Sequence, residues 1–191
     1  MGALGTAAPV AAAGPATSPH YYLSLGDSLA FGYQPDLVAA GDLNAADYRG
    51  YAENFAAMRP ALTLVNYGCS GETTGSMLAG GCPWPGTLHD SYRGAPSQAA
   101  AAAAFLRAHP GQVDLISIDI GSNDLLALVG RCRSEPDPTA CISAGVPATL
   151  ATLASNYGTL LARSPRWHRA PGSSCSTTTT RWPSRCQPVT L

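Results

Sequence analysis

The stretch Tyr21–Pro35 reads Tyr-Tyr-Leu-Ser-Leu-Gly-Asp-Ser-Leu-Ala-Phe-Gly-Tyr-Gln-Pro, and it decides the fold that we expect for this chain. Its first five residues are a short apolar run rich in aromatic side chains, which predicts a buried strand. Gly26, Asp27 and Ser28 then favour a turn and a helix N-cap. This order would place a serine hydroxyl at the carboxyl edge of a sheet, where open α/β folds bind ligands. Taken alone, the three residues also fit a plain turn with a capping serine.

Two later segments have the same organisation. Leu62 to Val65 is an apolar run followed by Asn-Tyr-Gly-Cys-Ser-Gly-Glu-Thr-Thr at positions 66–74. Val113 to Ile120 is another apolar run, and it leads into Gly-Ser-Asn-Asp at positions 121–124. The chain therefore places small and polar residues at three predicted strand ends.

These three strand ends, in this order, resemble the blocks of the SGNH (GDSL) hydrolase family of esterases and lipases. Gly26-Asp27-Ser28-Leu29 matches the first block letter for letter, residues 66–73 resemble the second, and Gly121-x-Asn123-Asp124 is similar to the third. The resemblance covers roughly residues 21–163. It implies a three-layer α/β/α, flavodoxin-like domain with a parallel sheet. The family's fourth block, an Asp-x-x-His near the C-terminus, does not occur in this sequence, so we expect the C-terminal strand or strands to be missing.

The resemblance also implies a reaction, the hydrolysis of acyl esters through an acyl-serine intermediate without metal or cofactor. By motif position, Ser28 would be the nucleophile, and its N–H would donate to the oxyanion together with the N–H of Gly71 and the side chain of Asn123. A glycine lets its backbone approach a substrate closely. An amide donates a hydrogen bond without titrating.

No histidine in this sequence has the family's arrangement for a catalytic base, and His89, in the loop after Cys82, is the one close to the second block. The four histidines are His20, His89, His109 and His168, and none lies in an Asp-x-x-His. A serine hydroxyl needs an adjacent base to become a good nucleophile at neutral pH. We therefore assign no catalytic histidine or aspartate, and we expect an esterase or lipase whose rate of hydrolysis is strongly reduced.

The composition of the chain limits the kinds of partner that we expect. The chain has 191 residues, 46 % of them hydrophobic and 12 % charged, with a formal net charge of −1. This size suggests one domain with a substantial core. The charge gives no electrostatic reason to expect nucleic acid as a partner, and no apolar run is long enough to span a bilayer. We expect a monomer that acts on a small-molecule or lipid ester.

Cysteine spacing favours export. Cys69 and Cys82 flank a glycine-rich loop, and Cys132 and Cys141 flank a polar one. Pairs that close short loops are typical of extracellular disulfides. Zinc is the competing interpretation, but neither pair has a histidine or further cysteine at ligand spacing. Residues 1–19 are rich in Ala, Gly and Pro, and they fit a disordered leader or a signal-peptide remnant equally well.

The predicted helices are 44–58, 97–108 and 146–163, and their alternation with strands is typical of a parallel sheet covered on both faces. After Arg163 the pattern stops, because residues 164–191 have no acidic residue and almost no aliphatic side chain. We interpret this tail as a frameshift product. Read one nucleotide out of register with freely chosen codons, it can encode a helix end, a glycine turn and a buried strand. The alternative is a natural disordered tail. The predicted domain, itself incomplete, is thus 20–163.

Two other functions remain open from the sequence. One is a non-catalytic relative that binds lipid or glycan in the same crevice. The other is a phosphate-binding α/β domain that uses Gly26-Asp27-Ser28 as an anion cradle, although this turn lacks the glycine spacing and lysine of a P-loop.

Overall fold

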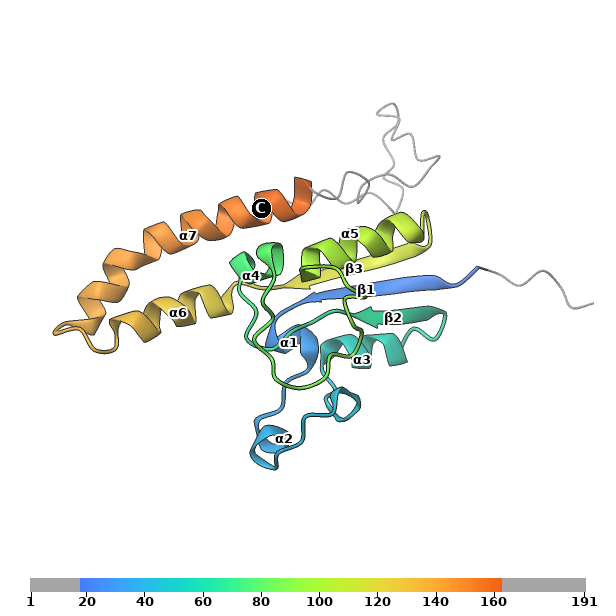
Figure 1. Ribbon diagram of the computed structural model, residues 1–191, viewed down its shortest axis with the longest axis horizontal. Coiled ribbons are helices and arrows are strands. Elements are labelled where there is room, and N and C mark those ends of the chain that lie inside the picture. The colour runs from blue at the N-terminus through green and yellow to red at the C-terminus, as the bar shows by residue number, and fades with distance from the viewer. Residues whose placement is uncertain (1–17, 163–191) are drawn as a thin grey trace, which may run out of the picture.

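The computed structural model describes residues 18–162, which form an α/β fold around a three-stranded parallel sheet (Figure 1). The strands are β1 (His20–Gly26), β2 (Leu62–Asn66) and β3 (Val113–Asp119), in the order β2-β1-β3. The predicted parallel α/β architecture is confirmed. Because all three strands run in the same direction, Gly26, Asn66 and Asp119 end at the same edge of the sheet.

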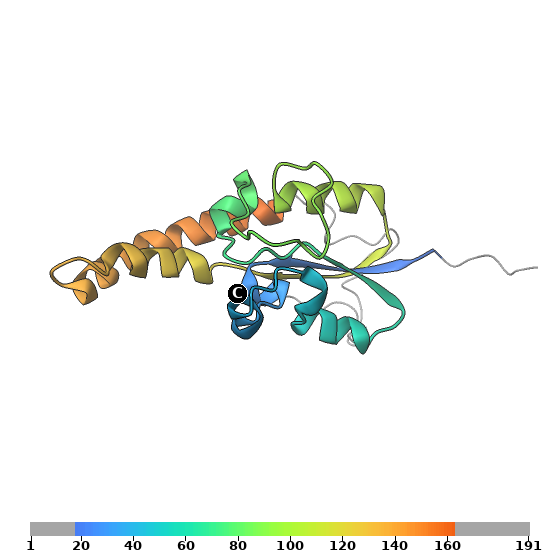
Figure 2. The same ribbon diagram turned by 60° about the horizontal axis from the view of Figure 1, so that its bottom comes forward.

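Helices cover both faces of this sheet. They are α1 (Ser28–Phe31), α2 (Pro35–Ala39), α3 (Tyr51–Ala57), α4 (Thr74–Ala79), α5 (Gln98–Ala108), α6 (Ser122–Cys132) and α7 (Pro138–Ala162), with a 3-10 helix at Ala45–Asp47. Figure 2 shows α4, α5 and α7 on one side of the sheet and α1 and α3 on the other. These helices and the sheet form the three layers that the sequence predicts.

Strand β1 is the centre of the core. Its residues alternate between the faces, as side chains of a strand do. Leu23 and Leu25 pack with Ile116 and Ile118 of β3 under α5. Tyr22 points to the other face, where its ring meets Phe55 of α3 at a centroid distance of 5.2 Å. Both faces of β1 are therefore buried, which explains why its sequence is a nearly continuous apolar run.

The helix predicted at 97–108 is confirmed, with Ser97 as its N-cap accepting from Ala100 N at 3.2 Å. The helix predicted at 44–58 is wrong in its first half, since only a 3-10 turn precedes α3 there. Tyr48 has extended backbone and a fully buried side chain, and the Glu53 carboxylate accepts from Gly50 N at 2.8 Å to start α3. The buried Tyr48 and the separate N-terminal cap of α3 thus interrupt the helix that the sequence pattern predicts over 44–58.

Two other differences concern the last helices. Helix α7 begins at Pro138 rather than at residue 146, and it continues through Pro147. Pro138 is the first residue of α7, where the missing N–H of a proline has no partner to lose. Pro147 lies inside the helix, where it removes one main-chain hydrogen bond. Helices α4 and α6 begin within the polar blocks and were not predicted.

Several predictions concern residues outside the described range. They are the leader, apart from Ser18 and Pro19, and the whole tail 164–191 with His168 and the frameshift. Within residues 18–162, no helix combines the length and the apolar character needed to cross a membrane.

Candidate active site

Ser28 lies at the start of α1, directly after the turn that ends β1. Gly26 has φ +143°, and a Cβ there would lie 2.0 Å from the main-chain oxygen of Asp119. Asp27 N donates to that same oxygen at 2.9 Å. Asp27 is also the N-cap of α1, because its Oδ1 accepts from Leu29 N at 3.1 Å. The aspartate, and not the serine, thus caps the helix, so the partly buried Ser28 hydroxyl is not needed for this role.

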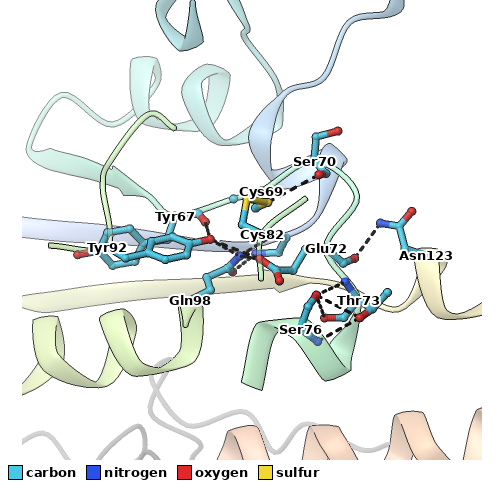
Figure 3. The surroundings of a disulfide bond; sticks show 12 residues. Tyr67, Cys69, Ser70, Glu72, Thr73, Ser76, Cys82, Tyr92, Gln98 and Asn123 are labelled. Carbon is cyan, nitrogen blue, oxygen red and sulfur yellow. Dashed lines mark hydrogen bonds between the residues drawn. A yellow bond between two sulfur atoms is a disulfide. The ribbon is translucent and has the colours of Figure 1, made fainter. Parts of the chain in front are cut away.

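The second and third blocks are joined by hydrogen bonds. Asn123 Nδ2 donates to the main-chain oxygen of Glu72 at 2.8 Å, as Figure 3 shows. The next residue, Asp124, accepts from Thr74 N at 2.9 Å and from Thr74 Oγ1 at 2.7 Å. Three hydrogen bonds therefore hold the first turn of α6 against the loop that contains Gly71.

Gly71 occupies an exposed position in this loop with φ +85°. A side chain here would be strained by the backbone, and its Cβ would lie 2.8 Å from Pro83 Cγ. The Cys69–Cys82 disulfide fixes the two segments that meet at this contact. Local structure thus explains why position 71 is a glycine, in addition to the role implied by its motif position.

Helix α7 supports the same region from behind. Asn156 Nδ2 donates to Thr74 Oγ1 at 2.8 Å, and Tyr157 OH donates to the Ile120 oxygen at 2.7 Å. The first bond supports block two and the second supports the end of β3. Neither residue carries a signal in the sequence, because both lie on an uncharged helix far from the blocks.

Three further residues near the blocks were missed by the sequence analysis. Gln98 and Glu72 are almost completely buried, with 1 % exposure each, and they form hydrogen bonds with each other and with Tyr92. Glu72 stands inside the second block, so the sequence motif already points to this residue. Its burial could not be inferred, because it depends on a helix that follows more than 20 residues later.

Two carboxyl groups at this edge have raised pKa values. Burial raises the pKa of Asp27, and the nearby Asp119 and Asp124 raise it further, against the hydrogen bond from Leu29 N. Burial also raises the pKa of Glu72. Asp27 Oδ2 and Glu72 Oε1 are buried without a hydrogen-bond partner. Both carboxyl groups therefore keep their protons to a higher pH in the folded protein than in the unfolded chain.

This predicts an unusual pH dependence of stability. A carboxyl with a higher pKa in the folded state keeps its proton to higher pH than in the unfolded state. Its contribution to the unfolding free energy is therefore lost as pH rises from its ordinary pKa through the raised one. We expect Glu72→Gln to flatten the decline of the unfolding free energy as pH rises above the ordinary glutamate pKa of 4.5, measured by urea unfolding. The exposed Glu135→Gln is the control, and an equal flattening in both variants would contradict the prediction.

The described histidines have other partners. His20 Nδ1 lies 2.9 Å from Asp114 Oδ1, at the opposite end of β1 from Ser28. His109 follows α5 and packs against the rings of Tyr21 and Phe105, which also contact each other. His89 is the nearest to block two in sequence, but its Nε2 donates to the Phe31 oxygen at 2.9 Å. Each of the three histidines thus has a hydrogen-bond partner other than Ser28, and the absence of a catalytic histidine stays a prediction.

Cys69, Glu72 and Cys82 place potential metal ligands within 4.8 Å of one another. The two sulfur atoms are, however, bonded to each other. A disulfide offers no thiolate, which is the form of cysteine that binds metals. We therefore assign no metal site to this group.

Both cysteine pairs predicted from the sequence form disulfides, Cys69–Cys82 and Cys132–Cys141. Closing loops of this length contributes about 3 kcal/mol each in the chain-entropy model. We expect serine replacement of either pair to lower the unfolding free energy by about that amount. Only the Cys69/Cys82 variant should also speed hydrogen exchange at the Gly71 amide, because only that bond fixes the Gly71 loop. Equal exchange in both variants would contradict this, and non-reducing peptide mapping checks the pairing itself.

Comparison with known proteins adds one finding. The model of the GDSL-like Lipase/Acylhydrolase family matches residues 24–184, which includes all three blocks and extends past Arg163. No curated protein matches the chain, and no solved structure does.

Proposed function

Because this chain belongs to the GDSL-like lipase/acylhydrolase family, whose members are ester hydrolases, we propose that Ser28 is the nucleophile of a serine esterase. The Ser28 oxygen would attack the carbonyl carbon of a carboxylic ester and form a covalent acyl-serine. The alcohol leaves with a proton, and water then releases the acid and restores the hydroxyl. No step of this reaction needs a metal or cofactor.

The observation that carries the proposal is the hydrogen bond from Asn123 Nδ2 to the Glu72 oxygen. An amide nitrogen has two hydrogens. Glu72 accepts one of them and thereby fixes the plane of the amide. The second hydrogen can then donate to the oxyanion that forms during attack. The N–H groups of Ser28 and Gly71 would complete the oxyanion hole, and preorganised donors of this kind stabilise the transition state strongly.

We propose that this chain hydrolyses esters slowly. The three described histidines bond elsewhere, and the sequence lacks an Asp-x-x-His. Without a base, the Ser28 hydroxyl loses its proton slowly and attacks poorly. We propose that the tail 164–191 replaces the segment that would supply this block, and that the hydrolase-like domain 20–163 is therefore incomplete.

The setting of the enzyme is also part of the proposal. Two disulfides close short loops, which supports secretion to an oxidising environment. We propose a monomer that acts on small-molecule or lipid esters. The alternative, a non-catalytic lipid- or glycan-binding relative, would keep the crevice without forming an acyl-serine.

Covalent labelling tests the proposed nucleophile. After incubation with p-nitrophenyl acetate, intact-mass analysis and peptide mapping should find one acetyl group, on the peptide that contains Ser28. Ser28→Ala should lose this adduct, whereas the exposed control Ser91→Ala should keep it. An adduct that survives Ser28→Ala would contradict the assignment, and binding of ester without any adduct would favour the non-catalytic alternative.

A further inference from the structure

Gln98 brackets the backbone of Gly26, two residues before Ser28. Its Oε1 accepts from Gly26 N at 2.6 Å, and its Nε2 donates to Gly26 O at 3.0 Å. One side-chain amide thus bonds both main-chain groups of the last residue of β1, and Gly26 O also accepts from Cys69 N at 3.0 Å. Gln98 itself is fixed, since it is the first residue of α5 and follows the Ser97 cap.

The same amide also reaches block two. Gln98 Nε2 donates to Glu72 Oε2 at 3.2 Å, and Tyr92 OH lies within hydrogen-bonding distance of both side chains. The main-chain oxygen of Glu72 then holds Asn123 Nδ2. A continuous path of hydrogen bonds therefore runs from Gly26 through Gln98 and Glu72 to Asn123, and Figure 3 shows its last three members together.

We propose that Gln98 and Glu72 are positioning residues that hold the Ser28 turn and the Asn123 amide in one fixed arrangement. This inference rests on the proposed esterase function of the same site. Gln98 acts on the nucleophile side through Gly26, and Glu72 acts on the oxyanion side through Asn123. Within residues 18–162, neither side chain is hydrogen-bonded to the side chain of Ser28 or of Asn123.

Burial explains why these two residues suit this role. Both side chains are 1 % exposed, so water does not replace a lost hydrogen bond readily. Polar networks in a low-dielectric interior are stronger than the same bonds at the surface. Oxyanion donors act only when they are held at the position where charge develops, and displacing reacting groups by about 1 Å can cost about 10²-fold in rate. A rigid link between the two sides of the site prevents such a displacement.

The first test follows the Asn123 side-chain amide by NMR and requires no catalysis. In Gln98→Ala, we expect the Nδ2 hydrogens of Asn123 to shift and to exchange faster with solvent, although Gln98 does not contact Asn123. Gln112→Ala is the matched control. Gln112 lies beyond the C-terminal end of α5, and within the described residues its side chain is hydrogen-bonded to His109 alone. An unchanged Asn123 amide in folded Gln98→Ala protein would overturn the proposal.

The second test measures acylation of Ser28 by p-nitrophenyl acetate as the rate at which the acetyl adduct forms on the peptide that contains Ser28, so that ester hydrolysis without Ser28 does not count. Gln98→Ala should lower the maximal rate by about 10²-fold and change the half-saturating ester concentration by less than about threefold. Gln98→Glu places a second carboxyl beside Glu72 and removes the N–H donors, so its rate should recover relative to the unsubstituted chain as pH falls. Combining Gln98→Glu with Glu72→Gln restores a donor–acceptor pair between the two positions, and it should recover at least about tenfold of the loss.

The two tests separate the two proposals. A double variant no faster than Gln98→Glu alone would overturn the positioning role. If the unsubstituted chain is acylated no faster than Ser28→Ala, the esterase function fails, and the Asn123 amide then decides the positioning role by itself.

Discussion

Restoring the reading frame after Arg163 is expected to raise kcat for p-nitrophenyl acetate by on the order of 10⁶-fold, provided that the repaired gene encodes an Asp-x-x-His. In well-studied serine hydrolases, the loss of the histidine removes nearly all rate enhancement except that of the oxyanion hole and substrate binding. The described part of the chain already has the Ser28 turn and the Asn123 amide in place. The missing base would then be the main defect.

The comparison needs four proteins, namely the unrepaired and the repaired chain, each with and without Ser28→Ala. The unrepaired chain should have a kcat only slightly above that of its own Ser28→Ala variant, and the repaired chain should exceed its variant by several orders of magnitude. Ordinary enzyme rates in the unrepaired chain, lost in Ser28→Ala, would show that another group already acts as the base. His89→Ala would be the first variant to examine in that case, because His89 lies closest in sequence to block two. A repaired gene without an Asp-x-x-His would contradict the frameshift hypothesis directly.

Removal of the Asn123 amide is the second large effect. In the repaired chain, Asn123→Ala should cost about 3 kcal/mol of transition-state stabilisation, seen as a fall in kcat of about 10²- to 10³-fold. The side chain donates where charge develops, and alanine has no donor. Asn123→Asp should be slower still, because a carboxylate would oppose the oxyanion instead of stabilising it.

Steady-state kinetics with a short-chain ester distinguishes this role from a structural one. A donor that acts only in the transition state lowers kcat with little change in KM. Asn54→Ala, at an exposed position of α3, is the matched control and should leave both constants unchanged. A similar fall in kcat for the two variants, or a loss confined to KM, would contradict the assignment of Asn123 to the oxyanion hole.

Local signals explain what the sequence predicted well. Residues 21–25, 62–65 and 113–120 are apolar runs between turn residues, and each lies on a strand of the structure. The alanine-rich helix α5 has a serine cap and a Pro-Gly stop, so its bounds needed no tertiary information. The motif residues lie at one sheet edge because parallel strands end together.

The errors have equally physical causes. Helix α6 begins inside the third block, where Gly121 and Ser122 look like a loop, and its stability comes from packing against α7. The role of Gln98 could not be predicted, because its partner Gly26 lies 72 positions earlier in the chain. From the sequence, Gln98 is one polar residue at the start of an alanine helix. Only the fold brings it to the turn before Ser28.

The strand order β2-β1-β3 also determines when the nucleophile turn can form during folding. The first strand pairs with β3 in a register that joins Ser24 to Ser117, and these two residues are 93 positions apart. Gly26 and Asp27 pack against Asp119, so their geometry depends on that distant strand. Parallel pairing of strands that are far apart in the sequence is slow, because the entropy of the long intervening loop is lost before the strands gain their contacts. On the ribosome, β1 and β2 would emerge well before their site is complete, and the turn at Ser28 would be shaped only after β3 has been synthesised.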